Sequence, residues 1–164
     1  MGRKEPPMPR FAISFAVLVL ATAGCQQEKT HSDNVLEIRA ADVVEREHWK
    51  ETNRVVGGSP VWMAPKASID QHMIREARVT FDRTGHPIVL VTLDSRGKAV
   101  MSLLCTQQES RPVAVLVDGK VVEVPILIGR LAGEFVIGNP KWTTEDARDF
   151  ARRLNDHTKR NAPA

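Results

Sequence analysis

The residue with the clearest chemistry in this sequence is Cys25, because of what precedes it. Residues 1–10 carry three basic side chains and one acidic one, and an apolar run from Phe11 to Ala23 follows. A basic start, an apolar core of roughly 7–15 residues and small residues before a cleavage point are typical of a secretory signal peptide. The run is too short to cross a hydrocarbon layer of ~30 Å as a stable helix. We therefore predict an export signal over residues 1–24.

The small residues from Thr22 to Gly24 immediately before Cys25 are similar to a bacterial lipobox, in which the cysteine is acylated and becomes the mature N-terminus. We predict that Cys25 carries acyl chains such as palmitate and holds the protein on a membrane of the bacterial envelope, facing the periplasm. Gln26 favours the outer membrane, since it is not the aspartate associated with inner-membrane retention in enteric bacteria. The alternative is an ordinary signal peptide followed by a buried structural cysteine.

Composition argues against nucleic acid as a partner. The first 24 residues hold three of the 23 basic residues and one of the 20 acidic ones, so the remaining 140 residues carry a net charge of only +1. Basic and acidic residues alternate along this part, as on a solvated surface. Once Cys25 is acylated, Cys105 is the one remaining thiol, and its helical context indicates a small buried hydrophobe rather than a redox group.

The sequence predicts no catalytic residue, no cofactor site and no metal site. The five histidines are dispersed, without the spacing of a metal site on a helix. No nucleophile elbow, phosphate loop or dinucleotide fingerprint occurs. Carboxylates such as Asp70, Asp82 and Asp94 fall at helix starts and turns, where bonding to the local backbone explains them. We therefore expect a protein that is not an enzyme.

The predicted fold class is α+β, with one two-layer domain over residues 35–158. Residues 25–34 lack apolar side chains after the cysteine and are expected to form a flexible tether, and residues 159–164 a disordered tail. We expect a mostly antiparallel sheet of five to six strands and three helices. Alternation predicts strands at 35–40, 61–63, 77–82, 88–93, 113–117 and 134–137. No element is predicted for the charged segment 42–54.

The three expected helices each have a start signal. Ser68 and Gln71 are spaced as a capping box for the first, Asp94 or Ser95 begins a second that runs to about Gln107, and Thr143 begins the third. Two apolar patterns are expected to face the core. They are Ala77, Val79 and Phe81 in the strand at 77–82, and Ala99, Val100, Leu103 and Leu104 in the second helix.

Asp118 and Gly119 stand between two β-branched runs, which is a strong signal for a two-residue hairpin turn. A type I′ turn needs positive φ at both central positions, so we assign both residues a structural role rather than a catalytic one. The strand 113–117 lacks polar residues and is expected to be central. Pro125 cannot donate to a ladder, and it indicates an edge strand or a bulge near that position.

The segment from Ile69 to Asn155 resembles the head subdomain in the first periplasmic region of SecD, the membrane subunit of the SecDF protein-export complex. The similarity lies in short motifs in the same order: Ile69-Asp70, Ala77-Arg-Val79, Gly85-x-Pro87, Val91-Thr-Leu-Asp94, Gly97, Ala114-Val-Leu-Val-Asp-Gly-Lys-Val121 with Pro125, Ile137-x-Asn139-Pro140, and Thr143, Glu145, Ala147 and Leu154. The resemblance implies the fold and a surface that handles polypeptides.

This sequence departs from the family in two loops, with Pro140-Lys141 extra and the segment between Pro125 and Ile137 short. We expect no counterpart of the membrane-spanning part of SecD, so the resemblance does not imply a proton-driven motor. Two functions stay open. The first is a lipoprotein that binds a protein or unfolded polypeptide, with a link to export; the second is a structural or small-ligand-binding lipoprotein. A groove beside an exposed strand edge would favour the first, and a deep apolar pocket with convergent polar groups the second.

Overall fold

The computed structural model describes residues 34–129 and 133–160, so the predicted signal peptide, Cys25 and residues 26–33 lie outside the described residues. The elements, in chain order, are β1 (Leu36–Asp42), β2 (Lys50–Val56), β3 (Ser59–Met63), β4 (Ile69–Asp70), the 3₁₀ turn η1 (Gln71–Met73), β5 (Ile74–Phe81), β6 (Pro87–Leu93), α1 (Ser95–Gln107), β7 (Val113–Val117), β8 (Lys120–Glu123), β9 (Glu134–Gly138) and α2 (Thr144–Arg160). All recorded strand pairs are antiparallel, which confirms the predicted α+β class.

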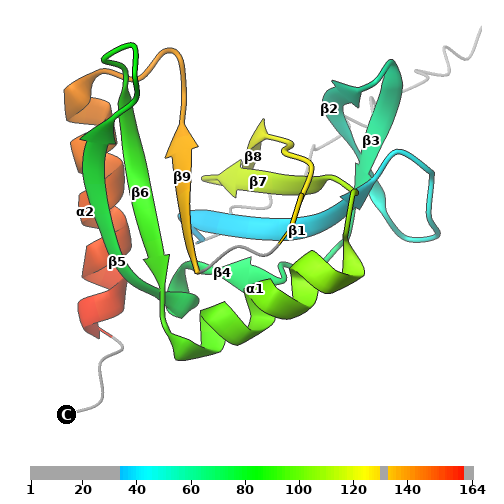
Figure 1. Ribbon diagram of the computed structural model, residues 1–164, viewed down its shortest axis with the longest axis horizontal. Coiled ribbons are helices and arrows are strands. Elements are labelled where there is room, and N and C mark those ends of the chain that lie inside the picture. Colours follow the sequence, from blue (N-terminus) through cyan, green and yellow to red (C-terminus); the bar gives the residue numbers. More distant parts are fainter. Residues whose placement is uncertain (1–33, 130–132, 161–164) are drawn as a thin grey trace, which may run out of the picture.

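The larger sheet has the strand order β2-β3-β1-β7-β8, with β4 paired to β1 (Figure 1). Its central strand β7 is buried at all five positions, because each face packs on apolar side chains. Val113 and Val115 belong to the main core with residues of α1, whereas Ala114 and Leu116 belong to a second cluster with residues of β3. Burial on both faces explains why this strand is an uninterrupted apolar run.

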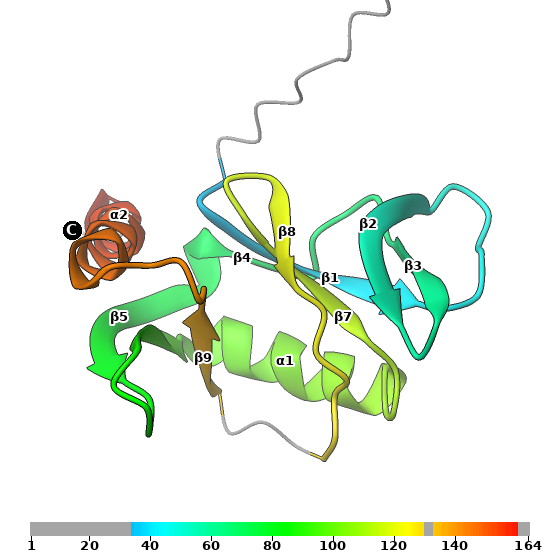
Figure 2. The same ribbon diagram turned by 90° about the horizontal axis from the view of Figure 1, so that it is seen from above.

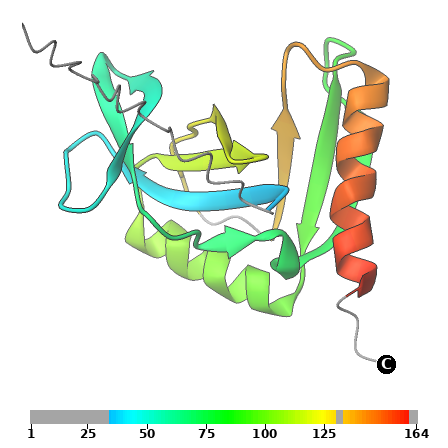
Figure 3. The ribbon, with the colours of Figure 1, turned by 180° about the vertical axis from the view of Figure 1, so that it is seen from behind.

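The smaller sheet has the order β5-β6-β9 and packs against α2. Figure 3 shows α2 at one end of the molecule and the β2–β3 hairpin at the opposite end. The buried stripe of α2 is formed by Ala147, Phe150, Ala151 and Leu154, as the sequence predicts. The helix starts as predicted, because the Thr143 hydroxyl accepts from the Asp146 N–H while the Asp146 carboxylate accepts from the Thr143 N–H. It runs to Arg160, two residues into the predicted tail.

Helix α1 begins as predicted, with the Asp94 carboxylate accepting a hydrogen bond from the Gly97 N–H at 2.6 Å. Its buried face consists of Gly97, Met101, Leu104 and Cys105. The expectation for Ala99 and Leu103 was wrong, since both are exposed. The close approach of Gly97 to Met73 sets the rotation of the helix, which places positions 97, 101, 104 and 105 on the inner face. The burial of Cys105 is confirmed.

The helix predicted from Ser68 does not form. The Ser68 N–H donates to the Ile38 carbonyl at 2.8 Å, and Ile69 and Asp70 pair with β1 as β4. The side chain of Gln71 accepts from the Val35 N–H instead of capping a helix. Only the three-residue turn η1 remains helical, and its cap is Asp70. Partners distant in sequence therefore override the local capping signal.

Two further expectations need correction. Phe81 is 56% exposed, because it lies at the end of β5, whereas Ala77 is buried as predicted. The segment 42–54, for which no element was predicted, contains most of β2. This strand is mostly exposed and pairs only with β3 among the described strands, so its sequence carries no buried alternation.

Candidate functional site

The turn between β7 and β8 lies at Asp118 and Gly119, whose φ angles of 49° and 72° are those that a type I′ turn requires. The structure adds a contact that sequence spacing could not indicate. Arg153 of α2 donates two hydrogen bonds to the Asp118 carboxylate, at 2.8 and 3.0 Å. These hydrogen bonds are the main reason that the pKa of Arg153 is raised. The negative charges of Asp118 and Asp149 raise it further, by a smaller amount. Asp118 therefore links the turn to α2.

A hollow of about 890 Å³ lies between this turn and α2, and its lining is largely charged. Four of these charged side chains are paired within the protein: Asp149 accepts from Arg152 and faces Arg153, which in turn binds Asp118. Trp142 packs against Phe150, with ring centroids 5.1 Å apart. The pair between Arg153 and Asp118 joins α2 to the large sheet at this hollow.

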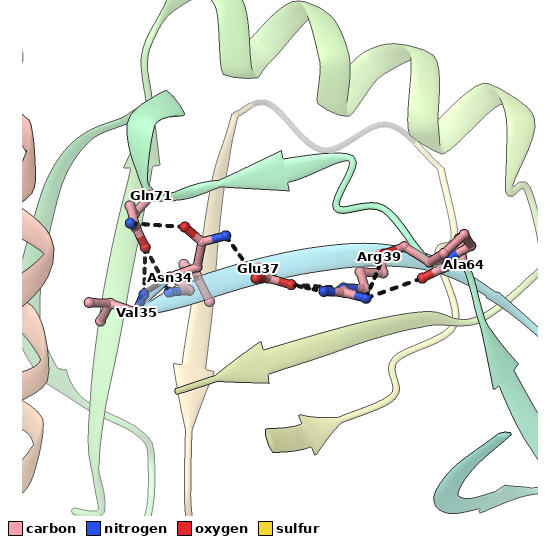
Figure 4. Close-up of polar contacts among 8 residues, drawn as sticks. Asn34, Val35, Glu37, Arg39, Ala64 and Gln71 are labelled. Carbon is pink, nitrogen blue, oxygen red and sulfur yellow. Dashed lines mark hydrogen bonds and ion pairs between the residues drawn. The ribbon is translucent and has the colours of Figure 1, made fainter. Parts of the chain in front are cut away.

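A line of polar side chains runs along β1 (Figure 4). Gln71 accepts from the Val35 N–H at 2.5 Å and donates to Asn34 at 3.1 Å. Asn34 donates to the buried carboxylate of Glu37, which also accepts from Arg39 at 2.7 Å. These bonds hold the start of β1 against η1. Asn34 therefore belongs to the domain, so the predicted tether ends at least one residue earlier than expected.

A largely apolar groove of about 440 Å³ lies between the two sheets. Its lining includes residues of β1, β7 and α1, among them Ile38, Val115 and Met101. It also includes Phe135 and Val136 of β9 and the segment 125–128. Glu123 is the single charged residue of its lining. We call this hollow the β9 groove.

Apolar side chains around the β9 groove face solvent. Ile128 is 84% exposed, Val136 51% and Ile126 47%. Most proteins leave single apolar residues exposed, but three together at the mouth of an apolar groove are typical of an interaction site.

Strand β9 presents one backbone edge toward this groove. In the order β5-β6-β9 it is the outer strand, and Figures 1 and 2 show it on the side that faces the large sheet. The Leu93 N–H donates to the Gly133 carbonyl at 2.8 Å, and Phe135 pairs with Val91 in the same register. Antiparallel ladders alternate, so the N–H and C=O groups of Glu134 and Val136 point away from β6. These groups could pair with an added strand.

The other outer strand beside the groove, β8, is less available. Arg54 of β2 donates to the carbonyls of Val121 and Val122 at 3.1 and 3.0 Å. The Pro125 carbonyl accepts from the Val113 N–H at 2.9 Å, and Pro125 has no N–H to offer. Arg54 thus already bonds to part of β8, and Pro125 offers no donor there, so β9 is the better acceptor for a peptide.

Other chemistry has little support in the described part of the chain. Across residues 34–129 and 133–160, no three His, Cys, Asp or Glu side chains lie close enough to hold a metal ion together. His72 and His157 contact each other edge to face, with centroids 6.4 Å apart. None of the helices in those ranges is both long and apolar enough to cross a membrane.

Relatives of known sequence agree with the motifs. The protein translocase subunit SecD of Magnetococcus marinus is 27% identical over 92 residues, which cover 56% of this chain and 18% of the relative. The SecD of Treponema pallidum is 33% identical over 60 residues, covering 37% of this chain and 10% of the relative. The chain thus spans less than a fifth of these relatives.

Solved structures share the fold. A structure described as that of "a membrane component SecDF that enhances protein export" superposes with a TM-score of 0.57 at 20% identity, covering 74% of this chain and 61% of the other. SecDF in a super-membrane-facing form gives the same TM-score and identity over 76% of this chain and 19% of the other. The family model "SecDF, P1 head subdomain" matches residues 46–156, which include β2 and β3 in addition to the segment recognised from its motifs. Since this match covers well over half of the chain, the protein belongs to the SecDF P1 head subdomain family.

Proposed function

We propose that this protein is a non-enzymatic lipoprotein, held on a bacterial envelope membrane by Cys25 and facing the periplasm. Its head domain binds an extended segment of a polypeptide that is being exported. The observation that carries the proposal is the outward backbone edge of β9 beside the apolar β9 groove. Membership of the SecDF P1 head family supports the link to export.

The chemistry of the groove favours a polypeptide over a small ligand. In strand addition, backbone hydrogen bonds supply affinity and alternate side chains enter pockets, which requires a strand edge with apolar surface beside it. The β9 groove has both features. Sites for small ligands combine apolar walls with several convergent polar groups, and here Glu123 is the one charged residue of the lining. A groove beside a strand edge is the feature expected to favour polypeptide binding, so the β9 groove supports the first of the two functions.

Replacing Ile128 tests the proposal. The full-length protein in detergent micelles is titrated against a fluorescent capped peptide of eight alternating Val and Thr residues, and anisotropy is measured. Burial of an isoleucine side chain contributes roughly 1.5–3 kcal/mol, so Ile128→Asp is expected to weaken binding by about tenfold or more. Ile128 is 84% exposed and Val44, distant in the β1–β2 loop, is 63% exposed. Val44→Asp is thus the matched control, and it should bind like wild type. Equal binding by both variants, or no binding by wild type, contradicts the proposal.

The membrane anchor has its own test. Each buried methylene of an acyl chain contributes about 0.8 kcal/mol, and more than one chain is needed for stable anchoring. Cys25→Ser removes the acceptor thiol, so processing should stall and fatty-acid labelling should be lost, while the folded domain is unchanged. Fractionation of cells that express wild type or the variant measures this. If the wild-type protein is unlabelled and free in the periplasm, the proposed anchor is wrong. The proposal that the β9 groove binds peptide is not affected by that result.

A further inference from the structure

We infer that Glu123 determines how far a bound polypeptide can pair along β9. The inference rests on the proposed function. Glu134, Val136 and Gly138 are the alternate residues of β9 whose backbone groups face away from β6. The Gly138 N–H already donates to the Glu123 carboxylate at 3.3 Å. Among the residues that the structure describes, the outward edge of β9 is therefore bonded at Gly138, with no recorded backbone partner at Glu134 and Val136.

The position of Glu123 makes it a boundary. It is the last residue of β8 and pairs with Val115, so its backbone belongs to the large sheet while its side chain crosses to the small one. It lines the β9 groove and also a second hollow of about 240 Å³, whose lining includes Ile88 and Gly138. Its side chain thus stands where these two hollows meet along β9, and a strand added beside Val136 would meet it on the way to Gly138.

An added strand would compete with this carboxylate. To pair with Gly138, a peptide must place a carbonyl oxygen where the Glu123 oxygen now accepts the hydrogen bond. An ionised carboxylate is an acceptor without a proton to donate, so it offers the peptide carbonyl repulsion instead of a bond. Pairing is therefore expected to stop after Val136 while Glu123 keeps its place.

The hydrogen bond between the Gly138 N–H and the Glu123 carboxylate is weak, so a peptide can displace it at some cost in free energy. Its 3.3 Å separation lies beyond the usual 2.7–3.2 Å range for such bonds. Glu123 therefore selects against long paired segments without excluding them. Segments that pair over only two outward positions avoid the competition, so extending a segment past Val136 should add little affinity while Glu123 keeps its place.

The test compares peptide lengths on charge variants of the full-length protein in detergent micelles. The probes are capped fluorescent peptides of four and eight alternating Val and Thr residues. Glu123→Ala frees the Gly138 N–H, so the affinity for the eight-residue peptide should rise by about two- to tenfold, the worth of one further net hydrogen bond. Affinity for the four-residue peptide should change less than twofold. Glu123→Gln keeps an oxygen acceptor and should stay closer to wild type.

Two controls distinguish competition by Glu123 at Gly138 from a general effect of removing a negative charge. Glu45→Ala removes an exposed acid of the β1–β2 loop, outside β9 and the β9 groove, and it should leave the ratio of the two affinities unchanged. Amide exchange at Gly138, measured without peptide, should be faster in Glu123→Ala than in Glu123→Gln, and unfolding temperatures show whether each variant is folded.

The outcomes are distinguishable. If wild type and Glu123→Ala both bind and the ratio of affinities is the same, the role of Glu123 is wrong and the proposed function stands. If neither protein binds either peptide, both are overturned. A length-dependent gain in Glu123→Ala that is absent in Glu45→Ala supports the inference.

Discussion

Gly97 is the position where a single methyl group has the clearest consequence. A Cβ built on Gly97 would lie 2.7 Å from the Met73 carbonyl oxygen, 3.0 Å from the Met73 Cβ and 3.1 Å from the Leu93 Cβ. The first neighbour is backbone and cannot rotate away. Gly97→Ala therefore forces α1 to move away from η1 and β6.

Two terms of opposite sign decide the outcome. Alanine is favoured over glycine within a helix by at most about 1 kcal/mol, and by less in the first turn. Overpacking a close contact costs about 1–3 kcal/mol. The cost of overpacking should exceed the gain in helix propensity, and we expect a net destabilisation of about 1–2 kcal/mol. For a domain of this size, this lowers the unfolding temperature by roughly 4–8 °C.

Thermal and urea unfolding of Gly97→Ala, followed by circular dichroism, measure this difference. Ala99→Gly on the exposed side of the same helix is the control, because it reports propensity alone and should cost up to about 1 kcal/mol. An unchanged or higher midpoint for Gly97→Ala would refute the reasoning, since it would mean that the close approach to Met73 imposes no penalty.

Three further predictions concern the turn, the ion pair and acid stability. Gly119→Val places a β-branched residue at φ 72° and should cost about 1–3 kcal/mol in urea unfolding, with peptide affinity of the folded fraction unchanged; lost affinity at an unchanged midpoint would contradict a structural role. A double-mutant cycle between Asp118 and Arg153, whose side chains are 51% and 38% exposed, should give a coupling below about 1 kcal/mol that weakens with salt; a coupling that salt leaves unchanged would contradict it. Burial opposes ionisation of Asp42, but hydrogen bonds from Arg46 and nearby backbone outweigh it and lower the pKa of Asp42. Its stabilisation is therefore complete above about pH 4 and lost as the pH falls through the lowered pKa, and Asp42→Asn should flatten that decline in acid unfolding curves.

The fold followed from the sequence where local signals and tertiary contacts agree. The run Val113–Val117 could be recognised as a central strand because burial on both faces leaves no polar position. The predicted helix at Ser68 failed because the side chain of Gln71 bonds to Val35, 36 residues away, which no local pattern reveals. Gly97 lies in the first turn of α1, where glycine costs little, but the contact with Met73 that requires it appears only once α1 and η1 are placed.

The candidate site was less predictable for the same reason. Pro125 correctly indicated a strand at a sheet edge, since β8 is the outer strand. The blocking of that edge by Arg54 depends on how the two ends of the large sheet approach each other. The contact of Glu123 with Gly138 joins two different sheets, so its geometry exists only in the folded protein.

The most direct test of polypeptide binding is residue-specific amide exchange along β9, measured by NMR on the ¹⁵N-labelled full-length protein in micelles with and without the eight-residue peptide. The N–H groups of Glu134 and Val136 point away from β6, whereas those of Phe135 and Ile137 are directed toward it. The account predicts that peptide slows exchange at Glu134 and Val136 and leaves Phe135 and Ile137 as they were. Protection confined to β8, or no change along β9 at peptide saturation, would contradict strand addition at this edge.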